Sequence, residues 1–124
     1  MPETLKIFQT AAAMAQHAGR RQALTAQNVA NADTPGFVAK SLPSFAEAFD
    51  QNGFSQLQTR SAHMGQTMAH AAMRETAVEP SPNGNAVSVE EEMFRSVEIS
   101  REHNRALTIY RHALTVIRTT LGRS

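Results

Sequence analysis

The chain has no cysteine and no tryptophan, and it has one tyrosine and six phenylalanines among its 124 residues. The lack of cysteine excludes disulfides and thiolate chemistry, and it suits a protein that leaves the reducing cytoplasm without oxidative folding. The scarcity of aromatic side chains argues against a large conventional core in what is at most one domain. The formal net charge of +1 gives no strong field to attract nucleic acid or an acidic membrane.

Long apolar runs are also absent. The longest near the N-terminus covers only residues 11–15, far short of the roughly 20 needed to span a bilayer. The first nine residues lack a basic segment followed by an apolar one, so we expect no cleavable signal peptide. If the protein is exported, it uses another route.

No pattern typical of a catalytic, cofactor-binding or metal site is found. The histidines are not in a His-Glu-x-x-His arrangement, and no cysteine could complete a zinc site; they are His17, His63, His70, His103 and His112. We interpret them as solvated or interface residues. The consecutive acids Glu90, Glu91 and Glu92 would point about 100° apart on a helix and cannot converge. A metal protein or enzyme using His63 and His70 is the alternative.

The N-terminal segment, residues 2–32, is predicted to form one helix. Two neighbouring apolar stripes with 3-4 spacing run along it: Leu5, Phe8, Ala12, Ala15, Ala26 and Val29, and beside them Ile7, Ala11, Met14 and Ala18. Gly19 is either a tolerated defect or a point of close helix contact. Pro35 ends the helix, and Thr34-Pro35-Gly36-Phe37 fits a type II turn.

The C-terminal segment, residues 89–121, is predicted to form a second, longer helix. Ser88 and Glu91 form a capping box at its start. Its two adjoining stripes are Leu107, Tyr110, Leu114, Ile117 and Leu121, and Ala106, Ile109, Ala113 and Val116. The one other long helix can cover one stripe, so the second stripe must stay exposed or meet another molecule. The predicted assembly interface is Leu5, Phe8, Met14, Val29, Leu107, Ile109, Tyr110, Leu114, Val116, Ile117 and Leu121.

Between these helices, residues 37–86 are rich in Ser, Gln, Met, His, Pro and Gly. We expect a flexible segment with short helices at 44–49 and 66–74 and a linker at 79–84. The predicted fold is therefore all-α: long N- and C-terminal helices packed as a coiled-coil-like pair, divided as 1–36, 37–86 and 87–124. Alternatively, the middle segment folds back over the second stripe and makes a compact domain.

Residues 28–37 read Asn-Val-Ala-Asn-Ala-Asp-Thr-Pro-Gly-Phe. This run resembles the signature of bacterial flagellar basal-body rod proteins, approximately Asn-Ile-Ala-Asn-Ala-Asp-Thr-Pro-Gly-Tyr; the matching residues singled out are Asn28, Asn31, Asp33, Thr34, Pro35 and Gly36. Residues 84–93 resemble the family's motif before its last helix, and residues 59–64 are weakly similar to its central region. Phe37, Val38 and Ala86 stand where Tyr, Lys and Asn are usual.

The resemblance implies a structural subunit of the proximal rod, a hollow drive shaft in the periplasm that transmits torque, encloses the export channel and is required for motility. It implies type III export and, as partners, further copies of the chain, FlgC, FlgF, FlgG, the adaptor FliE and the ring protein FliF. Nucleic acid, cofactors and membrane insertion are not implied. The alternatives are another rod or adaptor subunit, or a cytoplasmic helical adaptor or export chaperone.

Overall fold

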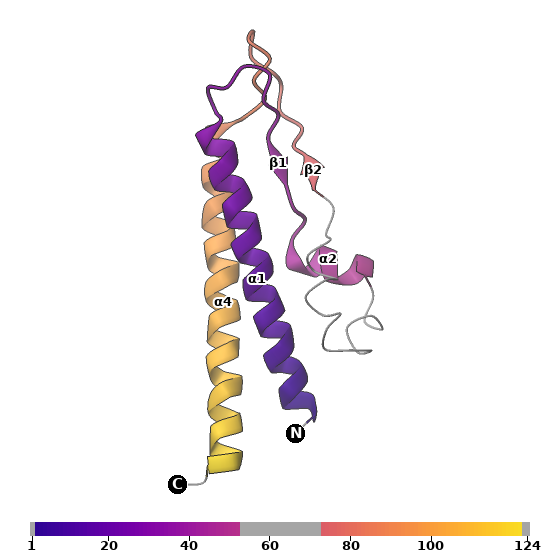
Figure 1. The fold of residues 1–124 in the computed structure, drawn as a ribbon, viewed down its shortest axis with the longest axis vertical. Helices are drawn as coiled ribbons and strands as arrows, with labels where there is room; N and C mark the ends of the chain where they lie inside the picture. Colours follow the sequence, from indigo (N-terminus) through magenta and orange to yellow (C-terminus); the bar gives the residue numbers. More distant parts are fainter. Residues whose placement is uncertain (1, 53–72, 123–124) are drawn as a thin grey trace.

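Two long helices dominate the computed structural model, which describes residues 2–52 and 73–122. Helices α1 (Pro2–Ala30) and α4 (Val89–Gly122) run antiparallel and side by side, with both ends of the chain at the same end of the pair (Figure 1). At 1.5 Å per residue, α4 is about 50 Å long. The predicted pairing of the terminal helices is confirmed, and the first helix ends two residues earlier than expected.

The turn after α1 has the predicted geometry. The amide of Phe37 donates to the carbonyl of Thr34 at 3.3 Å, and Gly36 has φ +75°. A type II turn needs a positive φ at its third residue, which glycine adopts without strain. The type II turn is therefore confirmed, and it reverses the chain so that the next segment returns along α1.

Serine hydroxyls cap the starts of two helices. The Ser88 hydroxyl accepts from the Glu91 amide at 3.4 Å at the start of α4. Ser44 does the same for the Glu47 amide at 3.3 Å, and so begins helix α2 (Phe45–Asn52), the short helix predicted from residue 44. Each hydroxyl satisfies one of the amides that a helix start leaves without a partner.

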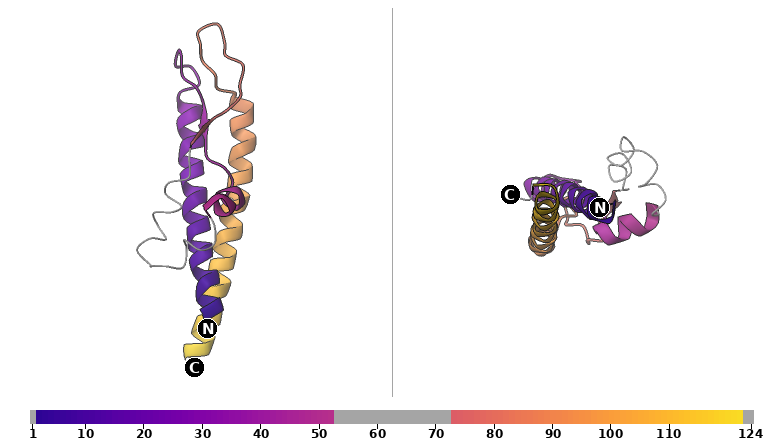
Figure 2. Two further views of the ribbon diagram at one scale, coloured as in Figure 1. Left: turned by 90° about the vertical axis from the view of Figure 1, so that its right-hand side faces the viewer. Right: turned by 90° about the horizontal axis from the view of Figure 1, so that it is seen from below.

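Helix α2 lies beside α1. Most of the length of α2 is away from α4 (Figure 2). The rings of Phe45 and Phe49 lie 5.7 Å apart between centroids, as their i, i+4 spacing predicts. Most of the second predicted short helix, residues 66–72, lies outside the described residues. Its described end is not helical, because Arg74 belongs to a strand.

Two very short strands were not predicted. Strands β1 (Lys40–Ser41) and β2 (Arg74–Glu75) pair antiparallel, and Val38 forms an isolated parallel bridge with Ala86. Strands of two residues are too short to leave an alternating pattern in the sequence. They join the chain after α1 to the chain before α4, so a minor β element accompanies the helical fold.

The predicted linker at 79–84 is a hydrogen-bonded turn. The amide of Gly84 donates to the carbonyl of Ser81 at 2.8 Å, and the amide of Ser81 donates to the carbonyl of Asn85 at 2.8 Å. Gly84 has φ +83°, a conformation that glycine adopts readily. This part of the middle segment is thus held by its own hydrogen bonds, which a simple linker would lack.

The contact between α1 and α4 follows a heptad pattern in which small and polar residues outnumber large apolar ones. The buried residues of α4 are spaced by seven: Glu92, Ile99, Ala106 and Ala113. On α1 the alternating 3-4 series is Ala11, Met14, Ala18, Arg21, Thr25 and Asn28, all buried except the half-buried Met14. This spacing is that of a coiled-coil seam, and the predicted coiled-coil-like pair is confirmed.

The seam corrects the expected assignment of stripes. On α1 the buried series continues the second stripe through Arg21, Thr25 and Asn28, which hydrophobicity alone could not identify. On α4 neither stripe is covered as a whole: Ala106 and Ala113 are buried, whereas Ile109 keeps 37% and Leu121 75% of its surface exposed. Helix α1 lies over the boundary between the two stripes of α4, because the small side chains of Ala106 and Ala113 let it approach closely there.

Candidate assembly surfaces

The signature residue Asn28 connects three elements. Its Nδ2 donates to the carbonyl of Lys40 at 2.7 Å and to Oε1 of Glu92 at 3.1 Å, while its Oδ1 accepts from the amide of Lys40 at 3.1 Å. Glu92 also accepts from Arg95 at 2.6 Å. Asn28 and Glu92 are both buried, so unpaired groups there would be costly. Asn28 therefore fixes β1 and the start of α4 against α1.

A second buried asparagine joins the two motifs that resemble rod proteins. Asn85 donates from Nδ2 to the carbonyls of Asn31 at 2.9 Å and Thr34 at 2.6 Å, and its Oδ1 accepts from the amide of Val87 at 3.1 Å. Next to it, a Cβ added to Gly84 would lie 3.3 Å from Cα of Gly36. Residues 28–37 and 84–93 thus form one interlocked structure at the end of the pair.

The remaining signature residues lie around this turn. Asn31 donates to the carbonyl of Gln27 and accepts from the Thr34 hydroxyl at 3.1 Å. Asp33 and Pro35 are exposed. The departure at Ala86 is readily accommodated, because this buried residue pairs through its backbone: its amide donates to the carbonyl of Phe37 at 2.7 Å.

An ion pair links the two long helices near their middle. Nη1 of Arg21 lies 2.6 Å from Oε2 of Glu102, with the side chains only 7% and 13% exposed. The other oxygen of Glu102 accepts from the amide of Phe45 at 3.3 Å, at the first residue of α2. One carboxylate thus joins α1, α2 and α4.

His17 differs from its predicted solvated or interface role. It is fully buried, its Nε2 lies 2.8 Å from the carbonyl of Pro43, and its ring packs edge-on against Phe45 at 5.9 Å between centroids. It holds the segment before α2 against α1. His63 and His70 lie outside the described residues, and residues 2–52 and 73–122 contain no cluster of three or more His, Asp or Glu suited to a metal ion.

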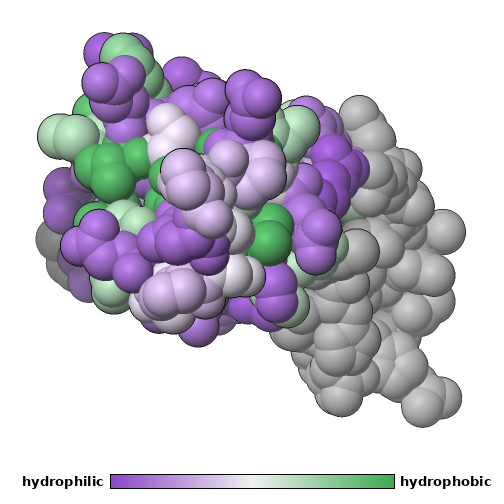
Figure 3. Space-filling view, turned by 90° about the horizontal axis from the view of Figure 1, so that it is seen from above, coloured by the Kyte–Doolittle hydropathy of each residue, from purple (hydrophilic) through white to green (hydrophobic). Residues whose placement is uncertain are grey.

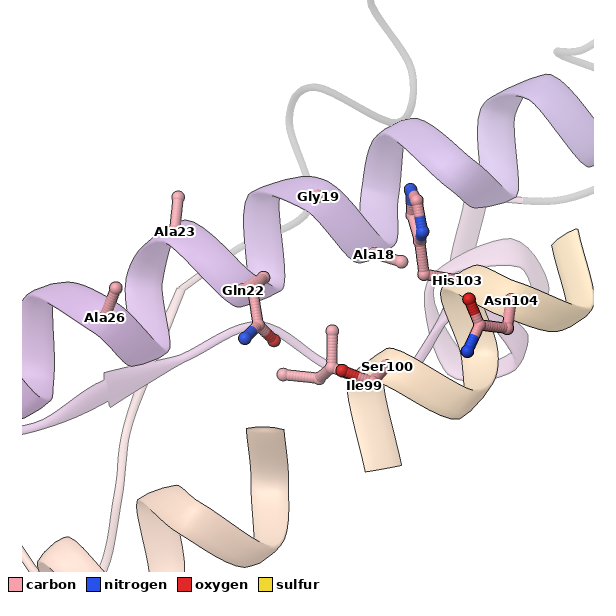
Figure 4. A pocket seen from close by; sticks show the side chains of 9 residues that line it. All are labelled: Ala18, Gly19, Gln22, Ala23, Ala26, Ile99, Ser100, His103 and Asn104. Atoms are coloured by element: carbon pink, nitrogen blue, oxygen red, sulfur yellow. The ribbon is translucent and has the colours of Figure 1, made fainter. Parts of the chain in front are cut away.

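A groove of about 420 Å³ runs between the flanks of α1 and α4 (Figure 4). Its lining is mostly small or uncharged: Ala18, Gly19, Gln22, Ala23, Ala26, Ile99, Ser100, His103 and Asn104. A Cβ on Gly19 would meet nothing within 4 Å, so Gly19 makes no close helix contact within the chain. The lining combines small apolar residues of α1 with uncharged polar residues of both helices.

The predicted interface residues divide into exposed and half-buried ones. Leu5, Val29, Ile109 and Leu121 are exposed. The others are half-buried: Phe8, Met14, Leu107, Tyr110, Leu114, Val116 and Ile117. Of these, Phe8 and Tyr110 contact one another across the helices, with ring centroids 4.4 Å apart. Except for Val29, these residues lie in the half of the pair that holds the chain ends.

A further apolar surface was missed in the sequence. We name it the α4 patch: Val89, Met93, Phe94 and Val97, with exposed fractions of 43%, 63%, 78% and 53%. The i, i+4, i+8 spacing of Val89, Met93 and Val97 was a signal that could have revealed it. Seen along the axis from this end, hydrophobic surface is flanked by hydrophilic surface on the side where α4 begins (Figure 3).

The paired terminal helices and the interlocked stretches 28–37 and 84–93 indicate a flagellar rod protein. Comparison with known proteins agrees with this class. Residues 8–37 match the family described as flagella basal body rod protein. The flagellar basal body rod protein FlgB of Agrobacterium fabrum (strain C58 / ATCC 33970) is 32% identical over 111 residues, covering 82% of this chain and 82% of that protein.

The chain belongs to the FlgB family of flagellar basal body rod proteins. It is a structural subunit of the flagellar rod, located in the basal body, where it assembles with other rod components and with itself, and a role in motility follows.

Beyond residue 102 of α4, Ile109 and Leu121 remain exposed. Residues 2–52 and 73–122 contain no helix both long and apolar enough to cross a bilayer.

Proposed function

We propose that the chain is a subunit of the proximal rod, the hollow shaft that transmits torque and encloses the export channel, and that it acts mechanically without catalysis. The observation that carries the proposal is the incomplete cover of α4, where Ile109 and Leu121 stay exposed beside the seam with α1. Each large apolar side chain contributes about 1.5–3 kcal/mol when fully buried, so neighbouring subunits gain by covering them.

The proposal includes an export route and neighbours. The chain would leave through the flagellar type III apparatus without a cleaved signal peptide and reach the periplasm, where FlgC, FlgF, FlgG, FliE and FliF are the proposed neighbours. The division into 1–36, 37–86 and 87–124 belongs to the same proposal: the first and last parts make the rod contacts, and the central segment adapts to its surroundings.

Substitutions on the open stripe test the mechanical role. Leu121→Asp should prevent incorporation into purified basal bodies and abolish motility while leaving the cellular amount of protein unchanged, because a lone charge buried in a subunit contact is strongly unfavourable. Leu121 is 75% exposed in the chain itself, so the isolated fold should not suffer. Leu114→Asp and Ile117→Asp should have the same effect, with an added loss of stability because both are half-buried.

Thr119→Asp is the matched control. Thr119 is exposed, lies near the same helix end as Leu121 and is displaced from it by about 200° around the helix, so this variant should assemble normally. Normal rods in the Leu121→Asp strain would contradict the proposed interface. A chain that stays in the cytoplasm and never co-purifies with basal bodies would support the export-chaperone alternative instead.

A further inference from the structure

The turn before α4 contains an Asn-Gly pair, Asn83-Gly84, and the sequence has a second one at Asn52-Gly53. Asn83 and Gly84 are exposed, and their turn lies at the end of the helix pair away from the chain ends (Figure 1). Asparagine is a chemically labile residue. It is most labile before glycine, because a residue without a Cβ does not hinder attack by its backbone nitrogen on the asparagine side chain. The main chain itself can therefore react at this turn.

The reaction at such a pair is deamidation. The Gly84 nitrogen loses its proton and forms a bond to Cγ of Asn83, the side-chain nitrogen leaves as ammonia, and a five-membered cyclic imide results. Water then opens the imide at one of its two C–N bonds. One opening gives aspartate in the original main chain. The other gives iso-aspartate, in which the main chain runs through Cβ and Cγ and is one carbon longer.

In the folded chain both reacting groups are engaged. The amide of Gly84 donates to the carbonyl of Ser81 at 2.8 Å, so the proton that must be lost is held in a hydrogen bond. Oδ1 of Asn83 accepts from the amide of Asn85 at 3.0 Å, which fixes the side chain in an Asx turn. Ring closure needs a free Gly84 nitrogen and an Asn83 side chain turned onto it, so these bonds must open first.

The interlocked structure also restrains the backbone of the pair. The carbonyl of Asn83 accepts from the amide of Gly36 at 3.2 Å. Gly84 has φ +83°, and a Cβ added to it would lie 3.3 Å from Cα of Gly36, so this position requires glycine. The fold thus needs the glycine that makes Asn83 labile, and the same contacts hold the pair away from the geometry of the imide.

We propose that Asn83 is a deamidation site that is open in the unfolded chain and closed once the turn before α4 has formed. A chain that stays unfolded then accumulates iso-aspartate at position 83. The extra main-chain carbon displaces the neighbouring groups from their partners on Gly36 and Ser81 and weakens the interlocked structure. Aspartate at position 83 keeps the original main chain and an oxygen for the Asn85 amide, so it is tolerated. The inference goes beyond the rod function and does not depend on it.

Peptide mapping by mass spectrometry across the urea transition tests the inference. The purified chain is incubated at fixed pH and temperature in a series of urea concentrations, with trimethylamine N-oxide at one concentration throughout to favour the folded chain at low urea. Circular dichroism at 222 nm gives the unfolded fraction, and deamidation at position 83 is measured in the tryptic peptide 75–95.

The deamidation rate should rise with the unfolded fraction and end at least about tenfold above its value in the folded chain. A tenfold ratio corresponds to an opening free energy of only about 1.4 kcal/mol. A rate that is equal on both sides of the transition, or higher in the folded chain, would overturn the inference.

The second pair supplies a chemical reference within the same samples. Above the transition, Asn52 and Asn83 should deamidate at rates within about a factor of two of one another, since only residual structure distinguishes them in the unfolded chain. A rate at Asn83 that stays many times slower there would show that the local sequence, and not the fold, limits the reaction. That result would also overturn the inference.

The effect on folding is measured on the products, in an Asn52→Gln chain so that position 83 is the only Asn-Gly site. Chains deamidated in urea are separated into aspartate and iso-aspartate forms and refolded, and the Asn83→Asp variant is the matched control. The iso-aspartate form should unfold at lower urea than this variant, which should keep the midpoint of the parent because Asn83 is exposed. Equal midpoints for the two forms would refute the predicted weakening of the interlocked structure.

Discussion

Removing one member of the ion pair between Arg21 and Glu102 should strongly destabilise the contact between the long helices. At a separation of charge centres of about 4 Å and an effective dielectric constant of about 20, the attraction is about 4 kcal/mol. The cost of taking both charges out of water offsets much of it. The pair therefore contributes little net stability, but either charge left alone is costly because the side chains are only 7% and 13% exposed.

Three variants measure this asymmetry. Arg21→Met and Glu102→Met should each lower the free energy of unfolding by about 3 kcal/mol, the lower end of the range for breaking a buried pair, since neither side chain is completely enclosed. The double variant should be no worse than either single variant, which gives a coupling energy of about 3 kcal/mol. Arg111→Met, at an exposed position of α4, should change stability by less than about 0.5 kcal/mol.

The assay is urea denaturation of the purified chain followed by circular dichroism at 222 nm. Trimethylamine N-oxide at constant concentration in every sample strengthens burial and keeps the weaker variants folded at the start of the titration. Single variants within about 1 kcal/mol of the parent would refute the reasoning. Additive losses in the double variant would refute it as well, since they would show that Arg21 and Glu102 act independently.

Other consequences of the structure can be measured in the same way. Asn28→Ala should lower the free energy of unfolding by about 2–3 kcal/mol, because it leaves buried partners of β1 and Glu92 unsatisfied; a midpoint unchanged in urea would show that water replaces the side chain. Gly84→Ala should cost more than Gly36→Ala, about 2 against about 1 kcal/mol, since both residues have positive φ but only at Gly84 would the new Cβ approach backbone, at 3.3 Å; equal losses would contradict this. In plain buffer, without trimethylamine N-oxide and without its neighbours, the chain should show frayed helix ends by circular dichroism, because long helices with incompletely covered apolar stripes are marginal in water; a cooperative, fully helical monomer in that buffer would favour the compact-domain alternative.

Local features were predictable from the sequence because their causes are local. The turn at Thr34–Phe37 depends on proline and glycine at fixed places, and the starts of α2 and α4 depend on a serine three residues before an amide it can reach. The two long helices leave periodic patterns over many turns, which made their existence and their pairing predictable. The rod-protein signature at residues 28–37 was recognisable from the sequence as well, because it contains the turn at Thr34–Phe37.

Burial of polar groups could not be predicted in this way. Arg21, Asn28 and Glu92 occupy the seam although their hydropathy assigns them to the surface, and each is buried because a partner far along the chain meets it. His17 is buried for the same reason, against Pro43 and Phe45. The two-residue strands are likewise set by the pairing between segments more than thirty residues apart, with no periodic pattern of their own.

By itself, the sequence determined where the two long helices begin, that they pair, and that α4 has more apolar surface than one partner covers. Those properties follow from backbone preferences and from side-chain spacing within one helix. Only the tertiary structure decided which residues form the seam, that buried asparagines join the two signature stretches, and that the α4 patch is left open. Those outcomes depend on distances between residues remote in sequence, which propensity and periodicity do not specify.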